Sequence, residues 1–329
     1  WKAVLPTGVA AGEPFRLCLR GEDRWGNPSD RGEQEFELRS SRSVDGLPGS
    51  VRFAPGGFAV VIEPLTVNDA GDLNIDLLDD AGSVVATSNP LRVSPRLALR
   101  PFWGDLHGQS EETIGTNSAR DFHLFARDRA FLDATSHQGN DFQITGEFWQ
   151  ELNEITAEFN EDGRFIAFPG YEWSGNTGLG GDRNVLFMEE GRPIHRSSHA
   201  LVDDLSDIDS DATSAADLFH ALKEEDCVAF AHIGGRYADI RMAHDVRLER
   251  SVEVHSAWGT FEWLIEDALE QGYRVGIVSN SDGHKGRPGA SHPGATKFGA
   301  YGGLTCMLAT ELTRAGLMDA LRRRHHYGT

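Results

Sequence analysis

The chain has 329 residues and a formal net charge of −20, with 39% hydrophobic and 25% charged residues. This length exceeds a usual single core and predicts one large domain with a smaller one, and no apolar stretch is long enough to cross a bilayer. The negative charge disfavours binding to a nucleic-acid backbone, so we expect a small-molecule substrate as partner, with no nucleic acid and no membrane; the oligomeric state stays open.

Residues 1–96 have the pattern of a β-sandwich. Residues 15–20 and 35–39 alternate apolar with polar side chains, and turn-forming pairs that contain glycine or proline separate such segments. The segments at 11–15 and 23–28 resemble immunoglobulin-like modules. We therefore predict a small immunoglobulin-like β-sandwich domain over residues 1–96, to which no motif assigns chemistry.

Residues 97–329 alternate predicted strands with predicted helices, which is the signature of parallel βα units. Ser118, Ser214 and Thr313 each precede a run with helical spacing and predict helix N-caps. The predicted strands lie at 102–107, 132–137, 165–172, 184–188, 228–232, 252–255, 274–279 and 304–308. This order of elements predicts an α/β domain over residues 97–329.

Histidines and carboxylates gather at the ends of these predicted strands. They are His107, His137, Glu172, His232, His255, Asp282 and His284. Enzymes built as β/α barrels place their active sites at the carboxyl ends of the strands, so we expect these side chains to lie close together. Imidazole and carboxylate together suit zinc, iron and manganese, and ligands that converge from different strands can enclose a metal cluster.

Two short motifs carry the strongest local signal. In residues 104–110, Gly-Asp-Leu-His-Gly-Gln-Ser, Asp105 and His107 are two residues apart at the end of a strand, and Asp282 and His284 repeat that spacing. Side chains with this spacing share one strand face and can reach a single cluster. The motifs predict metal binding, which we weigh against a turn-forming role for Asp282.

These residues resemble the polymerase and histidinol phosphatase (PHP) superfamily, and within it an uncharacterised bacterial subfamily that begins with the same seven residues. The likeness covers about residues 100–329. It implies a distorted, seven-stranded β/α barrel for residues 97–329. It also implies a metal-dependent hydrolase, first of all a phosphoesterase that attacks a small phosphate ester with metal-activated hydroxide.

The resemblance further implies a set of metal ligands at matching positions. They are His107, Gln109, Glu112, His137, Glu172, His199, His232, Asp282 and His284. Gln109 stands where the family has a second histidine, Ser136 stands where it has an aspartate, and Glu111 competes with Glu112 for the acidic position. Because an amide oxygen is a poorer ligand than imidazole, we expect two or three divalent ions, which would be zinc, manganese or iron.

Three further residues are candidates for catalysis. Arg236 and Arg183 can hold a phosphoryl oxygen because guanidinium offers paired donors, and His255 shares a strand face with Glu253 near the expected cluster. A surface position explains either arginine as well. Two alternatives stay open: a metal-dependent amide or ester hydrolase of amidohydrolase type, and a non-catalytic binding protein with a degenerate metal site.

The cysteines and the chain ends bear on the compartment. Cys18, Cys227 and Cys306 are far apart and form no C-x-x-C pair, so we expect buried thiols. No secretory signal opens the chain, and we expect a cytoplasmic protein. The chain begins at Trp1 rather than at a methionine and ends where a strand is expected to begin, so we expect further residues at both ends.

Overall fold

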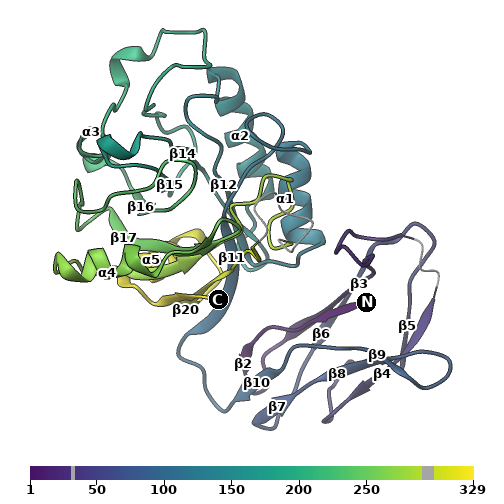
Figure 1. Ribbon diagram of the computed structural model, residues 1–329. Coiled ribbons are helices and arrows are strands. Elements are labelled where there is room, and N and C mark those ends of the chain that lie inside the picture. The colour runs from purple at the N-terminus through teal and green to yellow at the C-terminus, as the bar shows by residue number, and fades with distance from the viewer. Residues whose placement is uncertain (31–33, 291–299) are drawn as a thin grey trace. The chain divides into compact units, whose positions relative to one another are not determined.

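The computed structural model describes residues 1–30, 34–290 and 300–329. The chain forms two compact units, Trp1–Pro101 and Phe102–Thr329 (Figure 1). The domain boundary that the sequence predicts after residue 96 stays a prediction.

The first unit is all β among its described residues. Its strands β1 to β10 are Lys2–Val4, Gly8–Ala10, Phe15–Arg20, Glu35–Ser40, Ser50–Arg52, Ala59–Leu65, Gly71–Leu73, Ile75–Leu78, Val84–Thr87 and Leu91–Ser94. They form three sheets, in the orders β1-β3-β6, β2-β10-β7 and β5-β4-β8-β9. Leu17, Phe36 and Leu77 belong to the apolar core of this unit. The β content follows the predicted strand pattern, while the immunoglobulin-like topology stays a prediction.

The second unit holds two sheets. One has the order β13-β12-β11-β20-β21, and these strands are Ile166–Phe168, Ala134–His137, Arg100–Gly108, Thr305–Ala309 and His326–Gly328. The other has the order β14-β15-β16-β17-β18, with β19 beside β17; they are Gly170–Trp173, Arg183–Phe187, Cys227–Ala231, Glu249–Ser256, Gly259–Thr260 and Gly276–Ser279. Parallel pairing joins β11 to β12, β12 to β13, β16 to β17 and β17 to β19.

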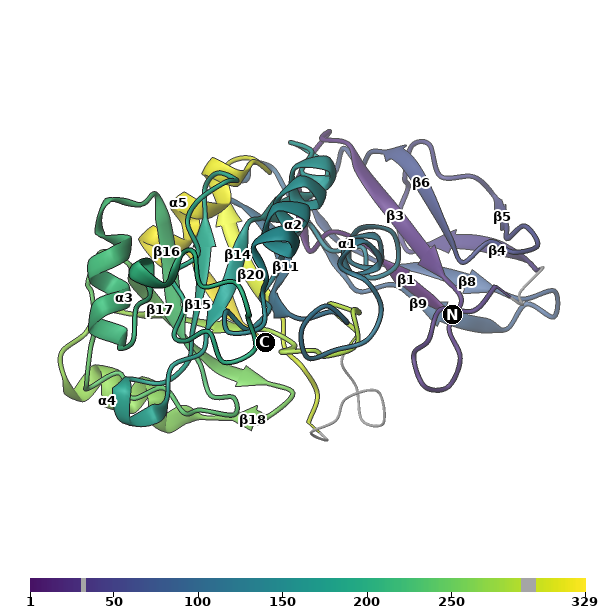
Figure 2. The same ribbon diagram turned by 90° about the horizontal axis from the view of Figure 1, so that it is seen from above.

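The described part of the chain has five α-helices, all in the second unit. They are α1 to α5, Ala119–Asp128, Gly146–Phe159, Ala215–Ala221, Glu262–Glu270 and Arg314–Arg323. The predicted caps are confirmed, because Ser118, Ser214 and Thr313 each accept a hydrogen bond from a backbone amide of the first turn. Helices α1 and α2 lie side by side and contact β12 and β13 (Figures 1 and 2). None of the described helices combines the length and the apolar character needed to cross a membrane.

The strand order departs from a regular parallel repeat at Pro169. The predicted strand at 165–172 is two strands, β13 and β14, because proline has no N–H and interrupts a hydrogen-bonded ladder. Strand β15 then runs antiparallel to both β14 and β16. Only a 3-10 turn, Thr177–Leu179, lies between β14 and β15, and this link is too short for the crossover that parallel strands need. The prediction of parallel βα units is therefore wrong for β15.

Two isolated parallel bridges connect the ends of the two sheets. One pairs Gly108, at the end of β11, with Gly283, and the other pairs Asn140 with Glu172 in β14. No continuous ladder closes the strands of the described residues into a barrel, so the observed architecture is a mixed α/β unit of two sheets. The first bridge brings the end of β11 next to the segment that follows β19. The second brings β14 next to the segment that follows β12.

Candidate metal centre

Four buried side chains gather where the two sheets meet. His107 lies at the end of β11, Glu172 lies in β14, His232 directly follows β16, and Asp282 follows β19. None of the four is more than 4% exposed. Folding therefore brings these four residues, all singled out by their positions at strand ends, into one place.

Glu172 lies between two imidazoles. One carboxylate oxygen is 3.3 Å from Nε2 of His232, and the other is 3.6 Å from Nε2 of His107. Gln109 donates a hydrogen bond of 3.1 Å from its amide to the same carboxylate. Burial acts to raise the pKa of Glu172, but the positive charges of His232 and His107 outweigh burial and lower the pKa. The carboxylate is the favoured form, which is the form that binds a cation.

Asp282 adds a second carboxylate to this centre. Its Oδ1 is 3.3 Å from Nε2 of His107 and 3.8 Å from Nδ1 of His284. The chain turns sharply at Asp282, whose φ of 46° is in the left-handed region. Nδ1 of His284 lies 2.9 Å from the backbone oxygen of Asp282. Both residues of the second motif therefore lie at the centre.

Asp105 anchors the segment that carries Asp282. Its carboxylate accepts hydrogen bonds from the backbone amides of Ser281, at 2.9 Å, and Gly289, at 2.7 Å. Burial raises the pKa of Asp105 to about 6, against the lowering effect of the bonds from Ser281. These contacts favour an anchoring role for Asp105 over the metal-binding role that its spacing from His107 predicts.

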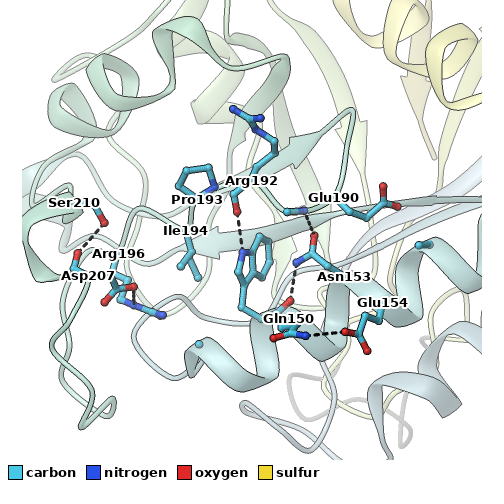
Figure 3. Close-up of a pocket in the computed structure, with 14 residues that line it drawn as sticks. Gln150, Asn153, Glu154, Glu190, Arg192, Pro193, Ile194, Arg196, Asp207 and Ser210 are labelled. Carbon is cyan, nitrogen blue, oxygen red and sulfur yellow. Dashed lines mark hydrogen bonds and ion pairs between the residues drawn. The ribbon is translucent and has the colours of Figure 1, made fainter.

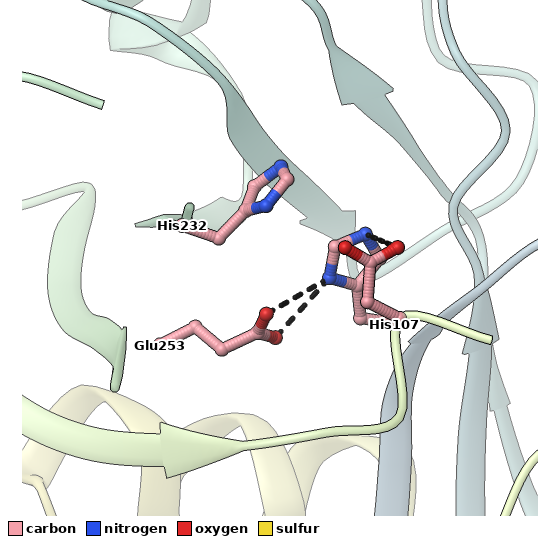
Figure 4. Close-up of side chains that lie close together, drawn as sticks. His107, His232 and Glu253 are labelled. Atoms are coloured by element: carbon pink, nitrogen blue, oxygen red, sulfur yellow. Dashed lines mark hydrogen bonds and ion pairs between the residues drawn. The ribbon is translucent and has the colours of Figure 1, made fainter. Parts of the chain in front are cut away.

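Glu253 lies on the other side of His107 (Figure 4). Glu253 is in β17, and its two carboxylate oxygens are 3.1 and 3.2 Å from Nδ1 of His107. The amide of Asn280 donates to one of these oxygens over 2.7 Å. The sequence predicts that Glu253 and His255 share one strand face and line the cavity as partners of the ligands rather than as ligands. It does not pair Glu253 with His107, because a single acid inside a strand has no spacing that signals a distant partner.

Asp182 is a site residue that sequence reasoning missed. It directly precedes β15 and, together with Glu172 and His232, forms a second buried group of carboxylate and imidazole atoms. Burial and the charge of Glu172 raise the pKa of Asp182 to about 7, while His232 and Arg236 act in the opposite direction. Nε of Arg236 donates to Asp182 over 2.9 Å, and its Nη2 is 3.9 Å from Glu172. An aspartate that follows two glycines has the sequence pattern of an ordinary turn residue.

This set of donors fits divalent metal ions. Two groups place their ligand atoms within 4.8 Å of one another: His107, His232, Glu253 and Asp282, and Glu172, Asp182 and His232. Among the described residues, Nε2 of His107 and both ring nitrogens of His232 are buried without a hydrogen-bond partner. A buried polar atom without a partner is costly, and a bound metal ion would occupy the lone pair of one nitrogen on each ring. Mixed nitrogen and oxygen donors suit zinc, manganese or iron.

His137 and Glu112 are connected through Ser110. Nε2 of His137 is 2.7 Å from Oγ of Ser110, which also donates to the carboxylate of Glu112. Burial lowers the pKa of His137 to about 3, so its imidazole is neutral and able to bind a metal. Glu111 is exposed, whereas Glu112 is partly buried. Of the two acids, Glu112 is therefore the one that faces a predicted ligand.

His199 and His255 have different surroundings. The two ring nitrogens of His199 lie 2.9 and 2.7 Å from the carboxylates of Asp211 and Asp207. Nδ1 of His255 is 2.7 Å from the hydroxyl of Thr260. Neither histidine belongs to the two metal-type groups found in the described parts of the chain.

The two candidate arginines differ in their environment. Arg183 is fully buried, with Nε donating to Glu249 over 3.2 Å and Nη1 to the backbone oxygen of Gly181 over 2.9 Å. Arg236 is 29% exposed in its side chain and lies beside Glu172. Arg183 therefore forms an internal ion pair with β17, and Arg236 is the arginine that borders the centre.

Two cavities of the protein are lined by different residues. A cavity of about 200 Å³ adjoins the centre and is lined by residues that include Gln109, Ile114, Asn140, Glu172, His232, Arg236, Trp258, Asp282 and His284. Another of about 600 Å³ lies along α2 (Figure 3). Trp149, one of its lining residues, donates to the backbone oxygen of Arg192 over 2.8 Å. The two cavities share no lining residue. Only the smaller one contains residues of the centre, which makes it the candidate substrate cavity.

Comparison with known sequences identifies relatives without an assigned activity. The family described as Protein of unknown function (DUF3604) matches residues 96–234. Uncharacterized proteins of Chlamydia pneumoniae, Chlamydia trachomatis serovar D and Chlamydia muridarum are 24%, 25% and 25% identical over 98% of this chain. The chain covers 54%, 55% and 55% of those proteins, so it spans about half the length of the curated relatives it matches.

One solved structure has a similar fold. It is the crystal structure of a two-domain protein from Bacteroides vulgatus that contains a predicted PHP-like metal-dependent phosphoesterase. The TM-score is 0.50 at 14% sequence identity, over 70% of this chain and 65% of that one. At this identity the likeness shows the fold alone.

Proposed function

We propose that residues 97–329 are a metal-dependent phosphoesterase domain with a PHP-type β/α barrel, preceded by an immunoglobulin-like domain of residues 1–96. One observation carries the activity: Nε2 of His107 and of His232 faces the carboxylate of Glu172, and neither atom has a hydrogen-bond partner among the described residues. The fold shared with a PHP-like neighbour supports the proposal, and the two bridges between the sheets support the barrel.

Two groups of side chains would hold the metal ions. His107 and Asp282 belong to one group, Glu172 and Asp182 belong to the other, and His232 is common to both. Further proposed ligands are Gln109, Glu112, His137, His199 and His284. Bound divalent ions would supply Lewis-acid chemistry, because they lower the pKa of water and offset the negative charge that develops on phosphoryl oxygens.

Arg236 would bind a phosphoryl oxygen of the substrate. Its Nε is held by Asp182, and this bond fixes the plane of the guanidinium beside the cavity. A donor that is already oriented loses little freedom when the substrate arrives. Arg183 and His255 take no part in this proposal, because Arg183 is paired with Glu249 and His255 contacts Thr260.

The cavity supports a small substrate. Its volume of about 200 Å³ would take a small phosphate ester. The carboxylates of Glu172 and Asp282 line this cavity, and their negative charge repels an anion. Arg236 alone does not balance them, so phosphate binding at this centre would depend on the metal ions.

Metal analysis and substrate hydrolysis would test the proposal together. We would measure metal content in protein purified without chelators, and hydrolysis of phosphomonoesters, phosphodiesters and carboxylic esters, by wild type and Asp282→Asn. Asp226→Asn makes the same change at an exposed aspartate and serves as control. We expect two or more metal ions and metal-dependent phosphate release that only Asp282→Asn abolishes.

Other results of these two measurements would favour one of the two alternative functions. A metal-loaded protein that is active only on carboxylic esters or amides would be an amidohydrolase-type enzyme. A protein that binds no metal after dialysis and reloading would be a binding protein with a degenerate site.

A further inference from the structure

We infer that Glu253 is a positioning residue that fixes the tautomer of His107 and so presents Nε2 of that ring to a metal ion. The inference rests on the metal-binding part of the proposed function and is independent of the substrate. Its basis is the arrangement of polar groups around the two nitrogens of one buried ring (Figure 4).

Glu253 is held rigidly against one edge of His107. Its side chain is 1% exposed, and both carboxylate oxygens contact Nδ1 of His107, at 3.1 and 3.2 Å. Asn280 donates to Glu253 over 2.7 Å, and its own carbonyl oxygen accepts a 2.8 Å hydrogen bond from the backbone amide of Leu106. Asn280 therefore ties the carboxylate to the residue that precedes His107 in β11.

The partner of Nδ1 decides where the proton of His107 resides. A carboxylate only accepts hydrogen bonds, so Nδ1 must be the N–H, and the neutral ring that a metal ion binds then carries its lone pair on Nε2. The amide of Asn184 also lies 3.1 Å from Nδ1, and its oxygen has no partner among the described residues. If that amide is turned by half a turn, its oxygen becomes a second acceptor for the same N–H, which leaves the tautomer unchanged.

The opposite nitrogen of His107 faces the centre. Nε2 is 3.3 Å from Asp282 and 3.6 Å from Glu172, and it has no hydrogen-bond partner in the described parts of the chain. A negative charge on the far side of the ring makes Nε2 a stronger electron donor toward a metal. Glu253 belongs to the first metal-type group, but its oxygens contact Nδ1 of His107 and the amide of Asn280, so it would act on the metal through His107 rather than as a ligand. Its loss would weaken metal binding and leave the ligands at Glu172 and Asp282 in place.

Metal affinity of three variants would test this role. We would measure zinc and manganese dissociation constants by competition with a chelator for Glu253→Ala, Glu253→Gln and Glu225→Gln. Glu225→Gln is the matched control, because it removes one carboxylate charge from an ion pair with Arg192. We expect Glu253→Ala to weaken binding roughly 10- to 100-fold, Glu253→Gln to weaken it less because its amide oxygen still accepts from Nδ1, and the control to leave it unchanged.

The tautomer can be read from the protein with Glu253 intact. In zinc-loaded protein with ¹⁵N-labelled histidine, we expect the His107 signal, assigned by its loss in His107→Gln, to carry its proton on Nδ1. A proton on Nε2, or folded Glu253→Ala with wild-type affinity, would overturn the inference. Wild type that binds no metal overturns both proposals. If the metal affinities change as expected but no phosphate is released, the positioning role of Glu253 is upheld and the phosphoesterase proposal is rejected.

Discussion

Nε2 of His232 lies 3.3 Å from a carboxylate oxygen of Glu172, and neither ring nitrogen of His232 makes a hydrogen bond within the described residues. Glu172→Gln keeps the shape of this side chain and removes its charge. We expect zinc affinity to fall by roughly 100-fold or more and metal-dependent phosphate release to fall with it. Chelator competition and phosphate release assays would measure both effects.

Glu154→Gln is the control for that substitution. Glu154 is an exposed residue of α2, so the same chemical change there should alter neither property. Unchanged metal affinity in Glu172→Gln would remove Glu172 from the proposed ligands.

Arg236→Lys should separate substrate binding from metal binding. Lysine keeps the positive charge but lacks the planar fork whose Nε donates to Asp182. We expect kcat/KM for a phosphomonoester to fall by roughly 10- to 100-fold, with unchanged metal content. Arg241→Lys, at an exposed arginine that also pairs with an aspartate, should retain full activity. A similar loss in both variants would show that the effect is not specific to Arg236, and unchanged kcat/KM in Arg236→Lys would remove the paired donors of Arg236 from the proposal.

His123 should make the protein less stable in acid. Its ring is fully buried between Phe122 and Phe159, and burial lowers its pKa from 6.5 to about 4. The unfolded chain therefore binds the proton first, so the stability that this neutral ring contributes above pH 6.5 is lost as the pH falls toward about 4. The loss amounts to roughly 3 kcal/mol for this one group.

His123→Phe should reduce that dependence on pH. Urea unfolding at about pH 7.5, 6 and 4.5 would measure the free energy of unfolding of wild type, His123→Phe and His220→Phe. His220 is exposed in α3, so its replacement should leave the wild-type slope. Parallel pH curves for wild type and His123→Phe would show that another group causes the acid loss.

Glu249→Gln should destabilise the second unit without acting on the metal. Glu249 and Arg183 form an ion pair in which both side chains are 0% exposed. Removal of one partner leaves a buried charge uncompensated, which typically costs about 3–5 kcal/mol. Urea unfolding would measure the loss, and Glu249→Gln with Arg183→Met should recover part of it. If the double variant is no more stable than the single one, the uncompensated charge is not the cause.

Local features of the second unit could be predicted from sequence. Ser118 and Thr313 cap helices as expected, because a cap depends on residues within one turn. His232 was placed at a strand end because the apolar run Cys227–Ala231 precedes it, and His107 because polar and glycine residues follow it. The direction of β15 could not be predicted in this way, since it depends on how the chain reverses between β14 and β15.

Contacts between distant residues could not be predicted. Glu253 meets His107 across 146 positions of sequence, and a single acid in a strand has no spacing that reveals such a contact. The partners of His199, Asp207 and Asp211, depend on the conformation of an irregular segment, for which periodicity gives no information. The ligand roles in the proposed centre therefore stay predictions until metal binding is measured.

The two sheets of the second unit are joined at their ends by isolated bridges, Gly108 to Gly283 and Asn140 to Glu172. His107 comes from one sheet, whereas His232 follows a strand of the other. An ion bound by both histidines would be a non-covalent cross-link between the sheets. A chelator that removes this ion would therefore also remove the cross-link. The protein would then lose hydrogen-exchange protection along this boundary before either sheet unfolded. The supply of metal would govern how long the folded chain survives proteases.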